Sequence, residues 1–139
     1  MTREVKKELI EKAVAMLAYA YVPYSGYTVG AALLCDDGKI YTGCNIENAA
    51  YTPTNCAERT AFFKAVSEGE RSFSAIAVVG GKGGAVTGYF PPCGVCRQVM
   101  MEFCDPASFT VLLWDGSNIK EMKLEELLPL GFGPSDISE

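Results

Sequence analysis

The sequence predicts an α/β protein in which a mixed sheet of about five strands lies between two layers of helices. Three observations lead to this prediction. The N-terminal stretch has apolar residues at helical spacing, two apolar segments joined by a short Asp-Gly turn have the pattern of a β-hairpin, and the remaining chain alternates strands with helices. Such alternation is typical of parallel strands joined by right-handed crossover helices. We therefore expect a three-layer α/β/α arrangement.

The first part of the chain is expected to form a helix followed by a hairpin. Residues 3 to about 20 place apolar side chains on one helical face, and Thr2 precedes them as a candidate N-cap. Residues 27–35 and 40–47 have strand composition. The Asp-Asp-Gly-Lys segment between them suits a hairpin turn, so the two strands should pair antiparallel.

The rest of the chain is expected to alternate between helices and strands. The elements follow in the order helix 55–66, strand 75–79, helix from about 93 to 103, strand 109–114, short strand 119–122 and helical turn 124–128. A Gly-rich segment at 80–88 lacks the features of a phosphate loop or a dinucleotide fingerprint, so we interpret it as a flexible connection. No repeat or linker divides the 139 residues, and this length supports one domain, 1–139.

Composition and charge exclude several classes of function. The chain has 12 Lys and Arg against 17 Asp and Glu, so its surface should repel a phosphate backbone and we expect no nucleic-acid partner. The N-terminus does not resemble a signal peptide, and no apolar run approaches the roughly 18 residues of a membrane span. We therefore expect a cytoplasmic protein without a membrane partner. The absence of histidine excludes Ser-His-Asp triads, Cys-His nucleophiles and His-ligated metals.

Three of the six cysteines lie where helices are expected to begin. Cys56 starts one helix, and Cys93 and Cys96 start another directly after Pro92. A helix N-terminus stabilises the thiolate, which is the form that binds a soft cation. Three thiolates supply three corners of a zinc tetrahedron and leave the fourth open for water, which indicates a catalytic rather than a structural site.

Two other uses of these cysteines stay open at this point. Cys35, Cys44 or Cys104 would complete a four-cysteine structural zinc site, although the context of each is typical of a small buried side chain. The Cys-x-x-Cys pair would alternatively be a redox motif, which needs neither Cys56 nor Glu58. A fourth protein ligand on the metal would favour the structural site.

Two charged side chains beside Cys56 suit catalysis at such a centre. Glu58 lies in the first turn of the helix, where a carboxylate can reach the open coordination position and act as general acid and base. The alternative is a solvated carboxylate favoured by the helix dipole. Three thiolates weaken zinc as a Lewis acid, and a guanidinium that donates to the sulfurs restores its acidity. Arg59 suits that role better than Arg97.

These motifs resemble those of the zinc-dependent cytidine deaminases. Cys56-Ala57-Glu58 and Pro92-Cys93-x-x-Cys96 match the ligand-x-Glu and Pro-Cys-x-x-Cys elements of the zinc deaminases in an all-cysteine form. Nearly the whole chain resembles the small, homotetrameric type within the cytidine/deoxycytidylate deaminase superfamily. The similar segments are 24–32, 43–49, 56–61, 93–98 and 127–132.

The resemblance implies an activity and an assembly. The expected reaction is hydrolytic deamination of cytidine, and of deoxycytidine, to uridine or deoxyuridine and ammonia in pyrimidine salvage. The expected enzyme is a homotetramer with one Zn²⁺ per chain and its sites at subunit junctions. The main alternatives are a deaminase of a related aminated substrate such as blasticidin S, or a zinc-stabilised binding module without catalysis.

The resemblance also assigns roles to individual residues. It implies Cys56, Cys93 and Cys96 as zinc ligands. It implies Glu58 as the catalytic acid and base. The implied substrate contacts are Asn45 and Glu47 at the ribose, the Ala57 backbone N–H at the pyrimidine O2, Tyr27 at the base, Tyr51 in the adjoining loop, and Phe132 reaching from a neighbouring subunit.

Overall fold

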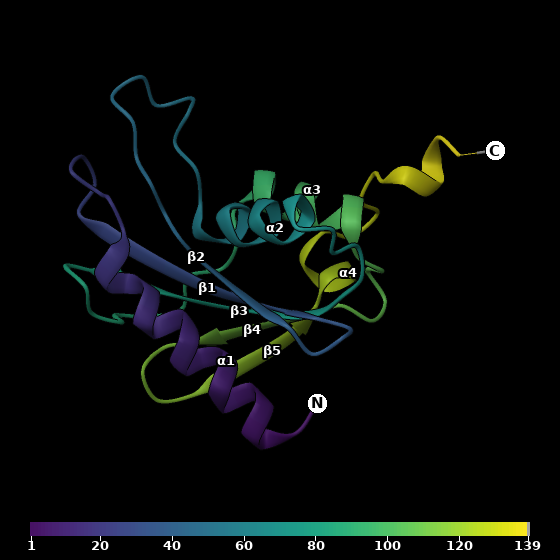
Figure 1. Ribbon diagram of the computed structural model, residues 1–139, viewed down its shortest axis with the longest axis horizontal. Coiled ribbons are helices and arrows are strands. Elements are labelled where there is room, and N and C mark those ends of the chain that lie inside the picture. Colours follow the sequence, from purple (N-terminus) through teal and green to yellow (C-terminus); the bar gives the residue numbers. More distant parts are fainter. Residues whose placement is uncertain (139) are drawn as a thin grey trace.

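The computed structural model describes residues 1–138 and confirms the predicted α/β class. Five strands form one mixed sheet in the order β2-β1-β3-β4-β5, and helices cover both of its faces (Figure 1). The strands are β1 (Tyr27–Cys35), β2 (Ile40–Cys44), β3 (Phe73–Lys82), β4 (Thr110–Trp114) and β5 (Ile119–Lys123). The helices are α1 (Arg3–Ala15), α2 (Ala57–Ser67), α3 (Gly94–Phe103) and α4 (Leu124–Leu127), with 3-10 turns η1 (Met16–Tyr19) and η2 (Pro134–Asp136).

Among the strands of residues 1–138, only one pair of neighbours is parallel. β1 pairs antiparallel with both β2 and β3, β3 pairs parallel with β4, and β4 pairs antiparallel with β5. The predicted antiparallel hairpin is therefore present. β2 and β3 run in the same direction on either side of β1, so α2 connects them across that strand, and α3 connects the parallel neighbours β3 and β4. Both predicted crossover connections are confirmed.

Two apolar clusters hold the three layers together. Leu9 of α1 is buried against one face of the sheet, while Phe62 of α2 and Met100 of α3 are buried against the other. Successive strand residues serve opposite clusters, as Ala32 and Leu33 of β1 show, because strand side chains alternate between faces. Each fully buried side chain of this size stabilises the fold by roughly 1.5–3 kcal/mol.

The helices begin at, or within two residues of, the positions that the sequence predicts. Thr2 is the N-cap of α1, and its hydroxyl accepts a hydrogen bond from the Val5 N–H at 3.2 Å. Helices α2 and α3 follow strands of the same direction, so both begin at the same edge of the sheet, the edge where α/β proteins build their sites. Among residues 1–138, none of the helices combines the length and the apolarity that a membrane crossing requires.

The Gly-rich segment at 80–88 differs from its prediction. Gly80 and Gly81 belong to β3, and the Thr87 N–H donates to the Gly80 carbonyl at 3.1 Å. A Cβ on Gly80 would lie 2.8 Å from the ring of Phe90. The prediction of a flexible connection was therefore wrong for the start of this segment, because glycine there permits close packing rather than flexibility.

Candidate active site

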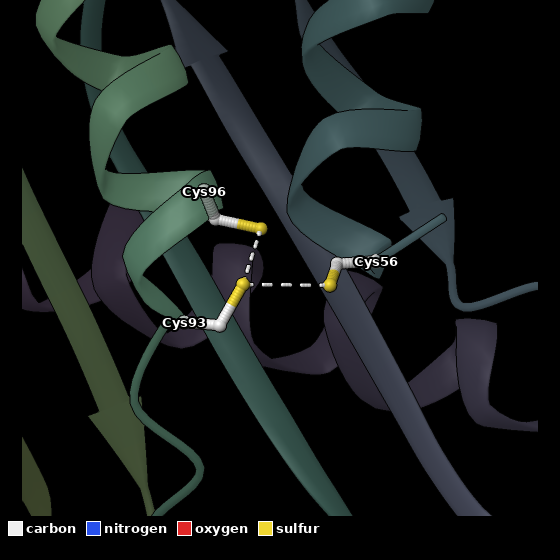
Figure 2. Close-up of side chains that lie close together, drawn as sticks. All are labelled: Cys56, Cys93 and Cys96. Carbon is white, nitrogen blue, oxygen red and sulfur yellow. Dashed lines mark hydrogen bonds between the residues drawn. The ribbon is translucent and has the colours of Figure 1, made fainter. Parts of the chain in front are cut away.

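Three thiols meet between the first turns of α2 and α3 (Figure 2). Cys56 is the N-cap of α2, Cys93 is the N-cap of α3, and Cys96 lies in the first turn of α3. The sulfur of Cys93 lies 3.7 Å from that of Cys56 and 3.5 Å from that of Cys96. We call these three side chains the thiol cluster.

The spacing within the thiol cluster fits a zinc ion. Sulfurs bonded to tetrahedral zinc at about 2.3 Å lie about 3.8 Å from one another, close to the two distances observed. Within residues 1–138, no further Cys, His, Asp or Glu has a ligand atom close enough to join the three sulfurs. Cys35, Cys44 and Cys104 are buried outside the cluster. The described residues thus supply three thiol ligands and do not form a four-cysteine site.

The surroundings of Cys56 favour a thiolate. Nη2 of Arg59 donates to the Cys56 sulfur at 3.3 Å. Hydrogen bonds from Cys96 and Arg59 lower the pKa of the Cys56 thiol to about 5. The free N–H groups at the start of α2 act in the same direction, since a helix N-terminus attracts negative charge. The site is therefore electrostatically prepared for a cation held by sulfur.

Arg97 binds backbone carbonyls rather than a ligand sulfur. Its Nε donates to the carbonyl of Pro92 at 2.7 Å, and its Nη1 donates to the carbonyl of Leu127 at 2.5 Å. These bonds tie the start of α3 to the end of α4. Of the two arginines that the sequence suggested, it is Arg59 that the structure places on a ligand sulfur.

Glu58 lines a small cavity beside the thiols. The cavity has a volume of about 130 Å³ and is lined by Val29, Asn45, Cys56, Ala57, Glu58, Phe90, Pro91 and Cys93. The Glu58 side chain is buried, with 4% of its surface exposed. Burial raises the pKa of its carboxyl to about 7. A carboxyl group in this environment can both accept and release a proton near neutral pH.

Asn45 lines the same cavity and also holds the chain around it. Its Oδ1 accepts from the Val29 N–H, and its Nδ2 donates to the Tyr27 carbonyl, both at 2.9 Å. The side chain therefore fixes the position of the start of β1 relative to the cavity. One amide hydrogen and one oxygen lone pair remain for another partner.

Glu47 and Tyr51 line a different hollow, which has a volume of about 400 Å³. The Glu47 carboxylate accepts from the backbone N–H groups of Tyr24 and Ser25, at 2.9 and 3.1 Å, and from the Ser25 hydroxyl. The Ser25 hydroxyl and these N–H groups hold the pKa of Glu47 below its usual value. Tyr51 is 73% exposed and packs edge-on against Tyr24.

Tyr27 packs against a residue that lines the cavity, whereas Phe132 lies beside α3. The Tyr27 ring packs against Phe90, a cavity residue, with ring centroids 6.0 Å apart. Phe132 is 59% exposed and lies over α3, where its carbonyl accepts from Gln98 Nε2 at 2.7 Å. Phe132 is not among the residues that line the cavity.

Sequence reasoning assigned no role to two cavity residues, Val29 and Phe90. A signal for Phe90 was present, since it comes just before the Pro91-Pro92-Cys93 segment and must approach the metal ligands. Nothing in the local pattern of β1 distinguishes Val29 from its strand neighbours.

Comparison with known proteins decides the family. Residues 3–112 match the model of the cytidine and deoxycytidylate deaminase zinc-binding region. The chain belongs to this family. The match includes the whole thiol cluster together with Glu58 and Arg59, so the candidate site lies inside the zinc-binding region of the deaminases.

Individual deaminases are similar over nearly their whole length. The cytidine deaminase of Sporosarcina psychrophila is 52% identical over 132 residues, covering 95% of this chain and 94% of the relative. That of Halalkalibacterium halodurans is 50% identical over 135 residues, covering 96% and 98%. The crystal structure of cytidine deaminase from Burkholderia pseudomallei superposes with a TM-score of 0.83 at 46% identity, covering 95% of this chain and all of that one.

Proposed function

We propose that this protein deaminates cytidine, and deoxycytidine, by hydrolysis at C4 of the base. The observation that carries the proposal is a set of three thiols at zinc spacing, two of which line one small cavity together with a buried carboxylate. Two relatives that are about half identical over nearly their full length are cytidine deaminases, which supports this activity over other deaminations.

The thiol cluster would hold one zinc ion per chain. When bound, zinc supplies the Lewis acidity that activates a water molecule for attack on C4. Arg59 donates to the Cys56 sulfur and so draws electron density away from a ligand. This hydrogen bond offsets the weak acidity expected of a metal held by three thiolates.

Glu58 would move the protons of the reaction. Its carboxylate takes a proton from the attacking water and delivers it to N3 of the pyrimidine. It then takes the proton of the hydroxyl formed at C4 and passes it to the amino group, which leaves as ammonia. Its place on the wall of the cavity that Cys56 and Cys93 also line supports this role.

Three groups would orient the nucleoside. The Ala57 N–H is one of the free donors at the start of α2 and would bind the pyrimidine O2. Asn45 would bind a ribose hydroxyl with the amide hydrogen and the lone pair that its backbone bonds leave free. Glu47 would bind the ribose with the lone pairs not engaged by Tyr24 and Ser25.

Tyr27, Tyr51 and Phe132 would complete the site, the last from a neighbouring subunit of a homotetramer. Phe132 and Leu130 expose apolar surface after α4, and a subunit contact would remove it from water. Light scattering should show four chains per particle, and a fully active monomer would contradict this assembly. We place the enzyme in the cytoplasm and in pyrimidine salvage. The six cysteines, all free in the described chain, suit a reducing compartment.

The test replaces Glu58 and follows cytidine turnover by the loss of absorbance in the cytosine band. Glu58→Gln should still bind one zinc per chain, while turnover falls by about 10²–10⁴-fold because the acid and base is removed. Glu68→Gln, an exposed carboxylate at the end of the same helix, is the matched control and should keep full activity. Near-normal deamination by Glu58→Gln would refute the assignment. Parallel assays with deoxycytidine and blasticidin S test the substrate.

A further inference from the structure

The cavity beside the thiol cluster is small enough to select by size. Its volume of about 130 Å³ compares with about 300–1,000 Å³ for ordinary small-molecule sites. A single pyrimidine ring with its exocyclic atoms is the part of a nucleoside that suits this space. The residues that close the cavity therefore decide which bases enter.

Phe90 forms one wall of the cavity, and its ring is packed against main chain on the side away from the cavity. Its ring lies against the backbone of β3, where a Cβ on Gly80 would come within 2.8 Å of the ring carbons. The chain before it is held by the antiparallel bridge between Gly80 and Gly88 and by the hydrogen bond from Thr87 to Gly80. The ring is thus supported from behind by main chain rather than by a flexible side chain.

Tyr27 supports the same ring from the side of β1. The two ring centroids lie 6.0 Å apart with their planes tilted by 41°. The ammonium group of Lys82 lies 5.5 Å from the centre of the Tyr27 ring and attracts its face. Tyr27 is 44% exposed, whereas Phe90 lines the cavity, so the pair extends from the surface to the site.

The polar lining of the cavity is already assigned, Asn45 to the ribose and the other groups to one edge of the base. In the proposed reaction the thiol cluster and Glu58 face C4 and N3, and the Ala57 N–H faces O2. The lining residues that remain apolar are Val29, Phe90 and Pro91. An apolar wall suits the faces of the ring and its C5–C6 edge, which carries only C–H groups.

We propose that Phe90 is the specificity-determining residue that limits the site to cytosine bases with no bulky substituent at C5. The proposal rests on the proposed deamination of cytidine and adds a size limit to it. Phe90 acts as a fixed wall, held between Gly80 and Tyr27, and its removal enlarges the cavity at the apolar edge of the base.

The experiment compares cytidine, 5-methylcytidine and 5-propynylcytidine. In the unmodified enzyme kcat/KM should fall steadily along this series. In Phe90→Ala the kcat/KM for cytidine divided by that for 5-propynylcytidine should shrink at least about tenfold, which is within the discrimination that an apolar pocket can supply. Cytidine itself should lose activity mainly through a higher KM. In Phe90→Leu, a milder variant, the kcat/KM ratio should lie between those of the unmodified enzyme and Phe90→Ala. Phe63→Ala, the same change on the exposed side of α2, should keep the original ratio.

A binding experiment tests this proposal independently of the proposed function. Calorimetry with the same nucleosides in the Glu58→Gln background reads the size limit without turnover. A Phe90→Ala variant that keeps the original selectivity in both arms would overturn the proposal while leaving deamination intact. An unmodified protein that fails to deaminate cytidine would overturn the proposed function, and the binding series would still decide the role of Phe90.

Discussion

Two groups of metal-ligand side chains lie in the described chain, and their sulfurs have opposite surroundings. The thiol cluster lies at the start of two helices (Figure 2). A second group, which we call the hairpin cluster, consists of Cys35 at the end of β1, Asp37 in the following turn and Glu70 after α2. In both groups the candidate ligand atoms lie within 4.8 Å of one another.

The charges around the two groups differ in sign. In the thiol cluster, Arg59 and the N-terminus of α2 stabilise negative sulfur at Cys56. In the hairpin cluster, burial and the neighbouring carboxylates of Glu70 and Asp37 raise the pKa of Cys35 to about 12. Glu70 is also already paired with the Lys39 ammonium at 3.7 Å. Closeness of ligand atoms therefore does not make a zinc site, and the stabilisation of the thiolate separates the two groups.

The largest difference should appear when one cysteine is removed from each group. Cys93→Ala should abolish both zinc binding and detectable turnover, because two sulfurs cannot hold the metal in a catalytic geometry. Cys35→Ala should keep one zinc per chain and full activity. Metal analysis and the cytidine assay measure both. Two zinc ions in the unmodified protein and one in Cys35→Ala would show that the hairpin cluster binds metal as well.

An intermediate effect is expected from the arginine on the sulfur. Arg59→Gln should lower zinc affinity or activity by about 10–100-fold, the usual cost of losing a partner of a metal ligand. Arg71→Gln is its counterpart near the hairpin cluster, where the guanidinium binds the carbonyls of Val66 and Glu70. That variant should match the unmodified enzyme in both measurements. Equal losses in the two variants would remove the special role of Arg59.

The smallest expected difference between the two groups is in the alkylation of their thiols in the intact chain. Cys93 is exposed and should react quickly in metal-free protein and be protected by zinc. Cys35 is 1% exposed, and its thiol stays protonated below a pH of about 12, so it should resist alkylation at pH 8 with or without zinc. Peptide mass spectrometry distinguishes the sites. Rapid modification of folded Cys35 would contradict the described electrostatics.

Local patterns in the sequence predicted most of the fold because they report local backbone geometry. β1 has the limits expected from its strand composition and from the Asp-Gly turn that follows it, and Thr2 caps α1 as expected. The extension of β3 through Gly80 did not follow, because a glycine accommodates either a bend or a close neighbour and only the packed Phe90 ring decides which.

The site was predictable to a similar extent. The metal ligands and Glu58 were proposed from two short motifs, and the structure brings the three thiols together because β2 and β3 run in the same direction and their helices start at one edge. Other contacts depend on tertiary distance. The bonds of Asn45 to the backbone of β1 and the wall formed by Phe90 have no signature in sequence spacing. The role of Phe132 depends on a neighbouring subunit and stays a prediction.

X-ray absorption at the zinc edge tests the metal centre most directly. The protein loaded with one zinc per chain should show three sulfurs at about 2.3 Å and one oxygen at about 2.0–2.2 Å, the pattern of three thiolates with one position left for water. The same spectrum from Cys35→Ala should be unchanged. Four sulfurs around the metal, or a shell of oxygen alone, would contradict a catalytic zinc held by the thiol cluster.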